Sequence, residues 1–215
     1  LFDFPNEFLF RLGPAIELGR SFVRAEYQRS FSPLMLLWKG IGAFVSHNPK
    51  YRYLFGPVSI SNAYTPLSRA MINQFMMRPG NTHELASMVR PRTPFKMSKQ
   101  LQQRLPLLTA PIATLDDLSD LVADVEPDSK PVPILLKQYV KLGAKALAFN
   151  VDPAFGQCLD CLCILDLLNA ENDVAAVRLS LAQGRAALML DRMRLAALAG
   201  QLDENILRAA DASLA

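Results

Sequence analysis

A succession of strand, loop and helix signals near its start most constrains the fold of this 215-residue chain. Residues 15–23 read as a short buried strand, yet they carry Glu17 and Arg20 where apolar side chains are expected. A polar loop follows and ends at Pro33, which suits the first turn of a helix expected over 33–46. A loop that leads into a helix N-terminus presents free backbone N–H groups, which suit a pyrophosphate or a phosphopantetheine arm.

Strand and helix signals continue through the following residues and predict a mixed α/β (α+β) fold. Residues 1–12 are expected to form a helix or an irregular lead-in. The further expected elements are strands at 54–61, 144–151 and 159–167 and helices at 66–77, 116–124 and 134–142. In the helix at 66–77, Met71, Met76 and Met77 are interpreted as core residues rather than as ligands.

The remaining segments predict a domain over 1–168 and a helical tail over 169–215. Within the domain, residues from 78 to about 130 form an insertion, which begins with a Pro- and Arg-rich stretch. That stretch is expected either to cross the substrate entrance or to be a solvated connection. After Asn169 the composition changes to Ala, Leu and Arg, which is typical of helix.

Several blocks of sequence resemble the GNAT acyltransferases, and more narrowly the N-acyltransferases of ornithine-lipid synthesis, which often carry a haemolysin label. The blocks lie in the family's order at 17–27, 37–42, 54–62, 89–95, 135–143 and 149–155. The resemblance implies a mixed sheet whose central strand, 15–23, is splayed from its neighbour at 54–61, with flanking helices. It also implies that strands ahead of residue 15 are missing. Similar proteins are bifunctional and place a lysophospholipid-type O-acyltransferase domain before the GNAT-like one.

The resemblance assigns roles to residues of the strand, the loop and the sheet edge. Glu17 is the candidate general base, or else it forms an ion pair with Arg20 that holds the strand. If Glu17 is the base, Arg20 is free to bind the carboxylate of an amino-acid acceptor. The acyl-donor or pantetheine site is assigned to Ser21, Phe22, Val23, Gln28, Arg29, Ser30, Phe31 and Ser32.

Acceptor contacts are assigned to the ends of two strands. Ser59, Ser61 and Asn62 end the strand at 54–61, and Asp152 ends the strand at 144–151. For Ser61, Asn62 and Asp152, turn formation is the alternative role. Ser21 has no histidine near it in sequence, so a hydrolase triad has little support.

The expected reaction moves a 3-hydroxy fatty acyl group from acyl carrier protein to the α-amine of ornithine or a similar amino acid. Side chains at Phe31 and Ser32 replace the glycines of a CoA pyrophosphate loop, which favours an acyl-carrier-protein thioester over acyl-CoA as donor. No tightly bound cofactor is expected. The alternatives are an acyl-homoserine-lactone-type synthase and a non-catalytic GNAT-fold module that binds lipid or protein.

Charge and cysteine usage bear on partners and location. Residues 1–104 carry 14 Lys and Arg against 5 Asp and Glu, a balance suited to acyl carrier protein or an anionic membrane. The basic residues are scattered and no nucleic-acid motif accompanies them, so nucleic acid is not expected. Cys158, Cys161 and Cys163 lack a nearby fourth ligand, so neither a metal site nor a disulfide is expected. We expect a cytoplasmic protein, peripheral at the inner membrane, without a signal peptide or membrane span.

Overall fold

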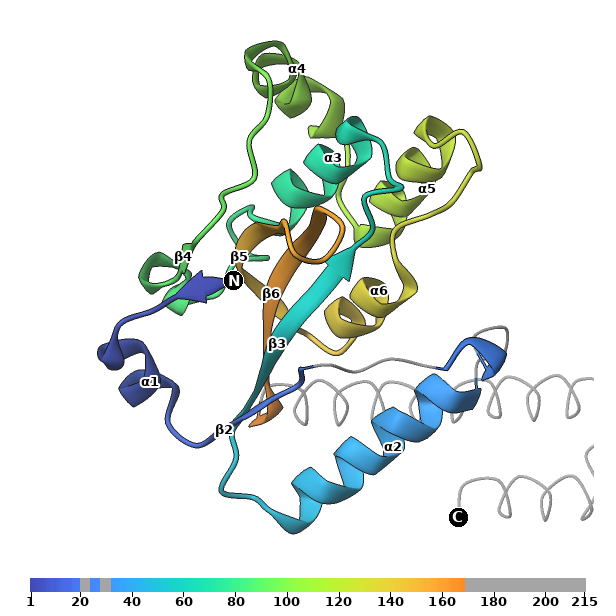
Figure 1. Ribbon diagram of the computed structural model, residues 1–215. Helices are drawn as coiled ribbons and strands as arrows, with labels where there is room; N and C mark the ends of the chain where they lie inside the picture. The colour runs from blue at the N-terminus through green and yellow to red at the C-terminus, as the bar shows by residue number, and fades with distance from the viewer. Residues whose placement is uncertain (20–23, 28–31, 169–215) are drawn as a thin grey trace, which may run out of the picture. The chain divides into compact units, whose positions relative to one another are not determined.

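The computed structural model describes residues 1–19, 24–27 and 32–168, and Leu1–Leu167 form one compact unit (Figure 1). Its frame is a four-stranded mixed sheet in the order β2-β3-β6-β5. The strands are β2 (Ala15–Glu17), β3 (Tyr53–Ile60), β5 (Lys145–Asp152) and β6 (Cys158–Asp166). β2 runs parallel to β3, whereas β6 is antiparallel to both β3 and β5. The predicted mixed α/β fold is confirmed, and the arrangement is consistent with a GNAT-like fold.

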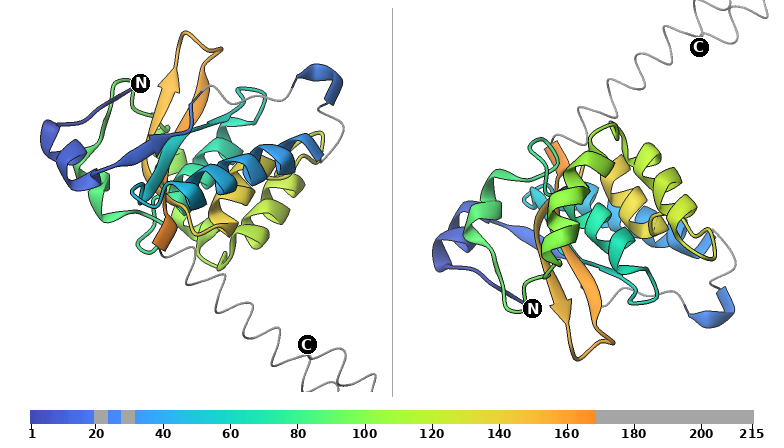
Figure 2. Two further views of the ribbon diagram at one scale, coloured as in Figure 1. Left: turned by 90° about the horizontal axis from the view of Figure 1, so that it is seen from below. Right: turned by 90° about the horizontal axis from the view of Figure 1, so that it is seen from above.

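Helices cover both faces of this sheet. The described α-helices are α1 (Asn6–Leu12), α2 (Ser32–His47), α3 (Pro66–Met76), α4 (Lys99–Thr109), α5 (Leu115–Val125) and α6 (Ile134–Lys141). Figure 2 shows α1 on one side of the sheet and α2, α3, α5 and α6 on the other. The elements expected at 33–46, 54–61, 66–77, 116–124, 134–142, 144–151 and 159–167 all appear, with bounds within one residue. The predicted tail, 169–215, lies outside the described residues.

The sheet is buried on both faces, which explains the nearly continuous apolar run of β6. On one face, Leu162 and Ile164 of β6 pack with Phe8 and Leu12 of α1. Side chains alternate along a strand, so Leu159 and its neighbours on the opposite face point toward the other helices. Burying each such Leu, Ile or Phe side chain contributes about 1.5–3 kcal/mol, so the β3-β6 pair anchors the unit.

The segment predicted as an insertion begins by covering the outer edge of β5. The N–H of His83 donates to the carbonyl of Ala146, and the N–H of Val151 donates to the carbonyl of Thr93. The short strand β4 (Arg90–Pro91) pairs with β1 (Phe2–Asp3) beside this edge. These bonds protect an otherwise open sheet edge, so this part of the segment is integral to the fold and not a purely solvated connection.

Helix α3 begins where its sequence signals place it. Thr65 is the N-cap, its hydroxyl accepts a hydrogen bond from the N–H of Ser68, and Pro66 is the first helical residue. Met71 and Met76 are each only 1% exposed, as predicted for core residues. The same prediction is wrong for Met77, which is 39% exposed because the helix ends at Met76 and the next residue turns outward.

β2 parts from β3 after a short parallel pairing. Glu17 lies opposite Phe55, and the N–H of Leu18 donates to the carbonyl of Phe55 at 2.7 Å. The carbonyl oxygen of Leu18 lies so close to Gly56 that a Cβ there would collide with it. Pro57 follows and has no N–H to extend the ladder. Gly56 and Pro57 therefore end the pairing, and Gly19, where a bulge was expected, already lies beyond β2.

Among the described residues β2 is the outermost strand, whereas the resemblance places the corresponding strand in the centre of the family's sheet. The pairing of β2 with β3 is confirmed, and among the described residues its hydrogen bonds end at Leu18. The splay itself stays a prediction. Residues 20–23, the remainder of the predicted strand, lie outside the described residues.

Substituting Gly56 with Ala should destabilise the protein by about 1–3 kcal/mol, because the added methyl group overlaps the carbonyl of Leu18. Gly42→Ala is the matched control: Gly42 lies in α2 with open space around it, and alanine should stabilise the helix by up to about 1 kcal/mol. Urea unfolding measures both changes. Equal midpoints for Gly56→Ala and wild type would contradict the role given to this contact.

Candidate functional site

The candidate site surrounds the opening between β2 and β3. Glu17 is the last residue of β2, and its side chain is exposed. Because Glu17 lies opposite Phe55, it shares a face of the sheet with Phe55 and with Ser59, two alternations further along β3. Ser59 is four positions after Phe55, which corresponds to roughly 13 Å along the strand. The opening therefore has a carboxylate near its start and a hydroxyl further along β3.

Ser59 is bound to a carboxylate that the sequence prediction did not include. Its Oγ donates a hydrogen bond of 2.6 Å to Oδ1 of Asp160, the residue opposite it on β6. Asp160 is only 2% exposed, whereas Ser59 is exposed. A single carboxylate inside the apolar run of β6 was the available signal, since Asp is seldom fully buried without a partner. Its partner emerges only from the register of β3 against β6.

Most of the predicted donor site cannot be placed. Arg20, Ser21, Phe22, Val23, Gln28, Arg29, Ser30 and Phe31 lie outside the described residues, and Ser32 is the first residue of α2. The two roles considered for Glu17, general base or ion pair with Arg20, both stay predictions. The strand-loop-helix order that motivated the donor site is present, with β2 before the loop and α2 after it.

The predicted acceptor residues Ser61, Asn62 and Asp152 lie at one edge of the sheet. β3 and β5 run in the same direction. Ile60, the last residue of β3, and Val151, the last but one of β5, both lie opposite Leu159. The carboxyl ends of β3 and β5 therefore meet at this edge, as expected from sequence.

Each of these side chains takes part in local structure. The hydroxyl of Ser61 accepts a hydrogen bond from the N–H of Ala63, and Oδ1 of Asp152 accepts one from the N–H of Ala154. These are the turn-forming roles considered as alternatives for Ser61 and Asp152. Oδ1 of Asn62 instead accepts from the guanidinium of Arg69. Contact with an acceptor stays a prediction for all three.

Arg69 is a second residue that sequence reasoning missed. It is 9% exposed, and it donates to Asn62 and to the carbonyl of Gln157 in the β5-β6 turn. Its Nε atom is buried without a partner, and burial lowers the pKa of the guanidinium. The side chain ties α3 to the ends of β3 and β6, so it fixes the edge at which the predicted acceptor residues lie.

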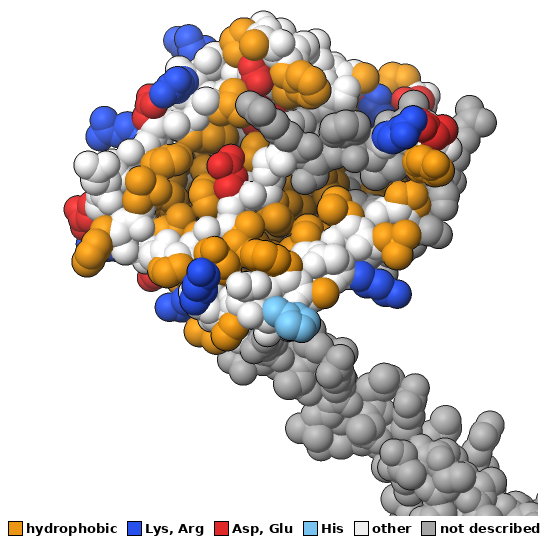
Figure 3. Space-filling view, turned by 60° about the horizontal axis from the view of Figure 1, so that its bottom comes forward, with side chains coloured by type: hydrophobic (Ala, Val, Ile, Leu, Met, Phe, Trp, Pro, Cys, Tyr) orange, Lys and Arg blue, Asp and Glu red, His pale blue; other side chains and the backbone are white. Residues whose placement is uncertain are grey.

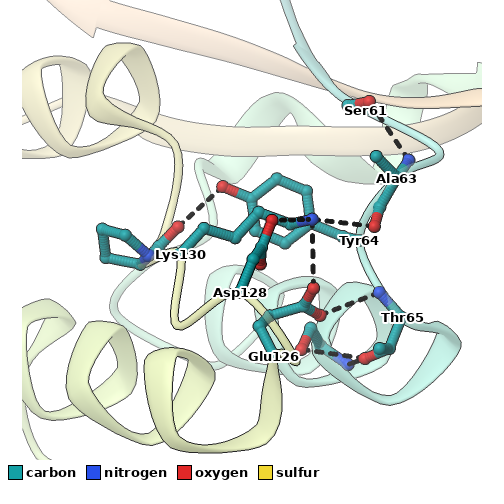
Figure 4. Close-up of polar contacts among 9 residues, drawn as sticks. Ser61, Ala63, Tyr64, Thr65, Glu126, Asp128 and Lys130 are labelled. Atoms are coloured by element: carbon teal, nitrogen blue, oxygen red, sulfur yellow. Dashed lines mark hydrogen bonds and ion pairs between the residues drawn. The ribbon is translucent and has the colours of Figure 1, made fainter.

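The loop after β3 is held by a buried carboxylate, Glu126 (Figure 4). Its Oε1 accepts a hydrogen bond from the N–H of Thr65 at 2.8 Å, and its Oε2 lies 3.3 Å from Nζ of Lys130. Burial alone would raise the pKa of Glu126, but hydrogen bonds from Ser68, Thr65 and Lys130 hold the pKa at about 2, below the usual 4.5. The carboxylate is therefore ionised at neutral pH and fixes the start of α3.

Lys130 completes this connection. Its ammonium group donates to the carbonyl of Ala63 at 2.9 Å and to Asp128, and it lies 4.8 Å from the ring centroid of Tyr64. The hydroxyl of Tyr64 donates to the carbonyl of Pro131 at 2.6 Å. As Figure 4 shows, residues after α5 thus brace the loop that carries the predicted acceptor contacts.

The three cysteines are buried thiols of β6. Cys161 and Cys163 lie on one face with their sulfur atoms 3.5 Å apart, and Cys158 points to the other face. Burial raises the pKa of Cys158 to about 11 and raises that of Cys161 well above 9. These two thiols are protonated at neutral pH, which excludes them as thiolate nucleophiles. In the described ranges no three His, Cys, Asp or Glu side chains are grouped as metal ligands.

Helix α2 exposes several large apolar side chains. Leu36, Leu37 and Phe44 of this helix are 65%, 40% and 52% exposed. Figure 3 shows hydrophobic side chains gathered in a hollowed part of this face, next to basic ones. None of the described helices is both long enough and apolar enough to cross a membrane.

Two other hollows lie away from this opening. One of about 470 Å³ lies between the residues preceding α1 and those around Met88. The other, of about 380 Å³, lies between α3 and α4 and is lined in part by Met77 and Met97. Neither is lined by a predicted site residue.

Comparison with known proteins links the chain to N-acyltransferases. It is 30% identical over 157 residues to a glycine N(alpha)-acyltransferase of Bacteroides thetaiotaomicron, covering 70% of this chain and 46% of that protein. It is 27% identical over 165 residues to a glycine N(alpha)-acyltransferase of Phocaeicola vulgatus, covering 73% of this chain and 49% of that protein. The matched part is thus about half the length of each relative. No protein-family profile and no solved structure matches the chain significantly.

Acid should release the brace formed by Glu126. Because the pKa of Glu126 is lower in the folded than in the unfolded protein, its contribution to stability is complete above about pH 4.5. That contribution is lost as the pH falls toward 2. Glu126→Gln should therefore cost about 2 kcal/mol at pH 7 and flatten the pH dependence of stability between pH 5 and 2. Asp128→Asn, at a side chain 62% exposed, is the control and should change stability by less than about 1 kcal/mol. Urea titrations over this pH range measure both, and an unaltered acid dependence in Glu126→Gln would contradict the assignment.

Proposed function

We propose that this protein is an N-acyltransferase that moves a fatty acyl group from a thioester to the α-amine of an amino acid. The observation that carries the proposal is the similarity to two proteins named glycine N(alpha)-acyltransferase over some 70% of the chain. The short pairing of β2 with β3 supports it, because among the described residues that pairing ends at Leu18 and the following part of β3 is where an extended thioester arm is proposed to bind. The chain's GNAT resemblance leads to the same reaction class.

The amino-acid acceptor is proposed to bind between Glu17 and the carboxyl ends of β3 and β5. The relatives' names make glycine the first acceptor to test, and the ornithine-lipid resemblance makes ornithine the second. In this proposal Glu17 removes a proton from the substrate ammonium, and Arg20 binds the acceptor carboxylate through its planar guanidinium. Glu17 is suited to this because its exposed carboxylate is accessible from solvent.

The donor is proposed to be an acyl-carrier-protein thioester whose acyl chain lies along apolar surface. The exposed side chains of α2 and the hollow in Figure 3 offer such a surface. Lys39 is exposed on the same helix, which carries no acidic residue. A surface that is both apolar and basic is complementary to an acidic carrier protein and to an anionic membrane. In this proposal the lipid product is released at the membrane.

Incubating the protein with acyl-carrier thioester and either glycine or ornithine should yield the N-acyl amino acid, detected by mass spectrometry. Glu17→Gln should lower kcat by about 10²–10⁴-fold if the carboxylate is the base. Arg20→Ala should raise KM for the amino acid. Glu7→Gln is the control, because Glu7 is an exposed carboxylate of α1 that pairs with Arg11 of the same helix. Absence of any acyl transfer to an amine by wild type would contradict the proposed function, and full activity of both site variants would contradict the assigned roles.

Charge reversal should test whether the basic surface binds the proposed acidic partners. Combining Arg29→Glu with Lys39→Glu should weaken binding to acyl carrier protein and to anionic vesicles by tenfold or more, since each basic residue near an anionic surface contributes about 1 kcal/mol. Added salt should weaken wild-type binding in the same way. Lys99→Glu, at an exposed site on α4, is the control. Calorimetry and vesicle sedimentation measure these changes, and unchanged affinity for both partners would reject the charge-based interaction.

A further inference from the structure

The pair formed by Ser59 and Asp160 combines an exposed hydroxyl with a buried carboxylate. The hydroxyl of Ser59 donates to Asp160 at 2.6 Å, and the thiol of Cys158 lies 3.5 Å from the same oxygen. Ion pairs among the described residues reach other carboxylates but none involves Asp160. A buried carboxylate without a cation is unfavourable. A cross-strand tie alone does not require this cost, because two hydroxyl side chains can form one.

The location of the pair points to a chemical use for it. Ser59 lies past the point where β2 leaves β3, on the sheet face that also carries Glu17. The carbonyl of Phe55 points toward β2, because it accepts the hydrogen bond from Leu18. Backbone groups alternate in direction along a strand, so those of Ser59 point to the same side. Pro57, which lies between them, lacks an N–H. Ser59, an exposed residue, therefore lies on β3 beyond the last residue paired with β2, and Asp160 holds its hydroxyl from β6.

We propose that Ser59 and Asp160 form a proton relay for the acyl transfer, an inference that rests on the proposed function. As the amine nitrogen attacks the thioester carbonyl carbon, the C–N bond forms and the nitrogen passes a proton to Oγ of Ser59. The proton already on Oγ moves to Oδ1 of Asp160. When the C–S bond breaks, the relay runs backward and its proton goes to the departing sulfur, which regenerates the carboxylate.

The relay complements Glu17 and does not replace it. An amino-acid ammonium must lose one proton to become a nucleophile and a second as the amide forms. Glu17, which is exposed, is placed to pass the first proton to solvent. The second proton passes from the amine nitrogen to the departing sulfur. A hydroxyl that is hydrogen-bonded to a water-excluded carboxylate can carry this transfer without losing the proton to solvent. In this scheme Ser59 contacts the substrate, and Asp160 is a positioning residue that acts through Ser59.

Steady-state kinetics on variants of the 215-residue chain test this inference. Ser59→Ala and Asp160→Asn should each lower kcat by about 10²–10⁴-fold, with little change in KM for either substrate. The double variant should be no slower than the slower single variant, because the two residues act as one unit. Ser59→Thr, which restores a hydroxyl at a strand position, should retain most of the wild-type rate. Asp166→Asn, on the same face of β6 but ion-paired with Arg52, is the control and should leave kcat unchanged.

The possible outcomes separate the inference from the proposed function. If wild type transfers acyl groups to the amine and Ser59→Ala keeps its full kcat, the relay is rejected while the function stands. Ser59→Ala decides this even if Asp160→Asn fails to fold, since Ser59 is exposed. A loss confined to KM or to thermal stability would assign the pair to structure and also reject the relay. If wild type acylates no amine, the proposed function and the relay fall together.

Discussion

The contact between the carbonyl of Leu18 and Gly56 determines how the candidate site is built. A hydrogen-bonded parallel pair would normally continue until one strand ends, and it would leave no room between its members. Here a residue without a Cβ admits the Leu18 carbonyl, and Pro57 then withholds the next donor. Beyond this point no described residue pairs with β3 on that side, while its other side stays paired with β6. The opening is thus a consequence of two adjacent residues in an otherwise regular strand.

The rest of the unit keeps that opening in a fixed position. β6 is buried over nearly its whole length and β3 at most of its positions, so the face and register of Ser59 and Asp160 follow from the core packing. At the far end of β3, Glu126 and Lys130 hold the loop that leads into α3. A polar network that is both buried and charged has few alternative arrangements, because releasing any member leaves a desolvated charge. The core packing of β3 against β6 and the network at the end of β3 together hold Ser59 in a defined position.

Local signals predicted the elements well, because each signal acts within a few residues. Thr65 and Pro66 mark the start of α3, and Gly143, at φ 86°, follows the end of α6. The prediction for Met77 was wrong because α3 ends one residue earlier than expected, and that difference places the side chain of Met77 in solvent and not in the core. The resemblance makes the strand at 15–23 central in the family's sheet, whereas β2 is the outermost strand among the described residues, and sequence pattern alone does not fix sheet order.

What local signals could not give were pairs of residues far apart in the chain. Ser59 and Asp160 are 101 residues apart, and Glu126 is 61 residues from Thr65. Only the strand register and the packing of helices bring them together. Thus Ser59, Ser61, Asn62 and Asp152 could be assigned to a strand edge from sequence, whereas the carboxylate behind Ser59 and the brace at Glu126 required the fold.

A crystal structure with a non-reactive thioether analogue of acyl-pantetheine tests the central claim most directly, namely that the opening between β2 and β3 receives the thioester. We expect the extended arm to lie along β3 past Phe55, with the thioether sulfur and the acyl carbonyl near the hydroxyl of Ser59. An analogue bound instead in the hollow between α3 and α4, with no density beside β3, would contradict the account.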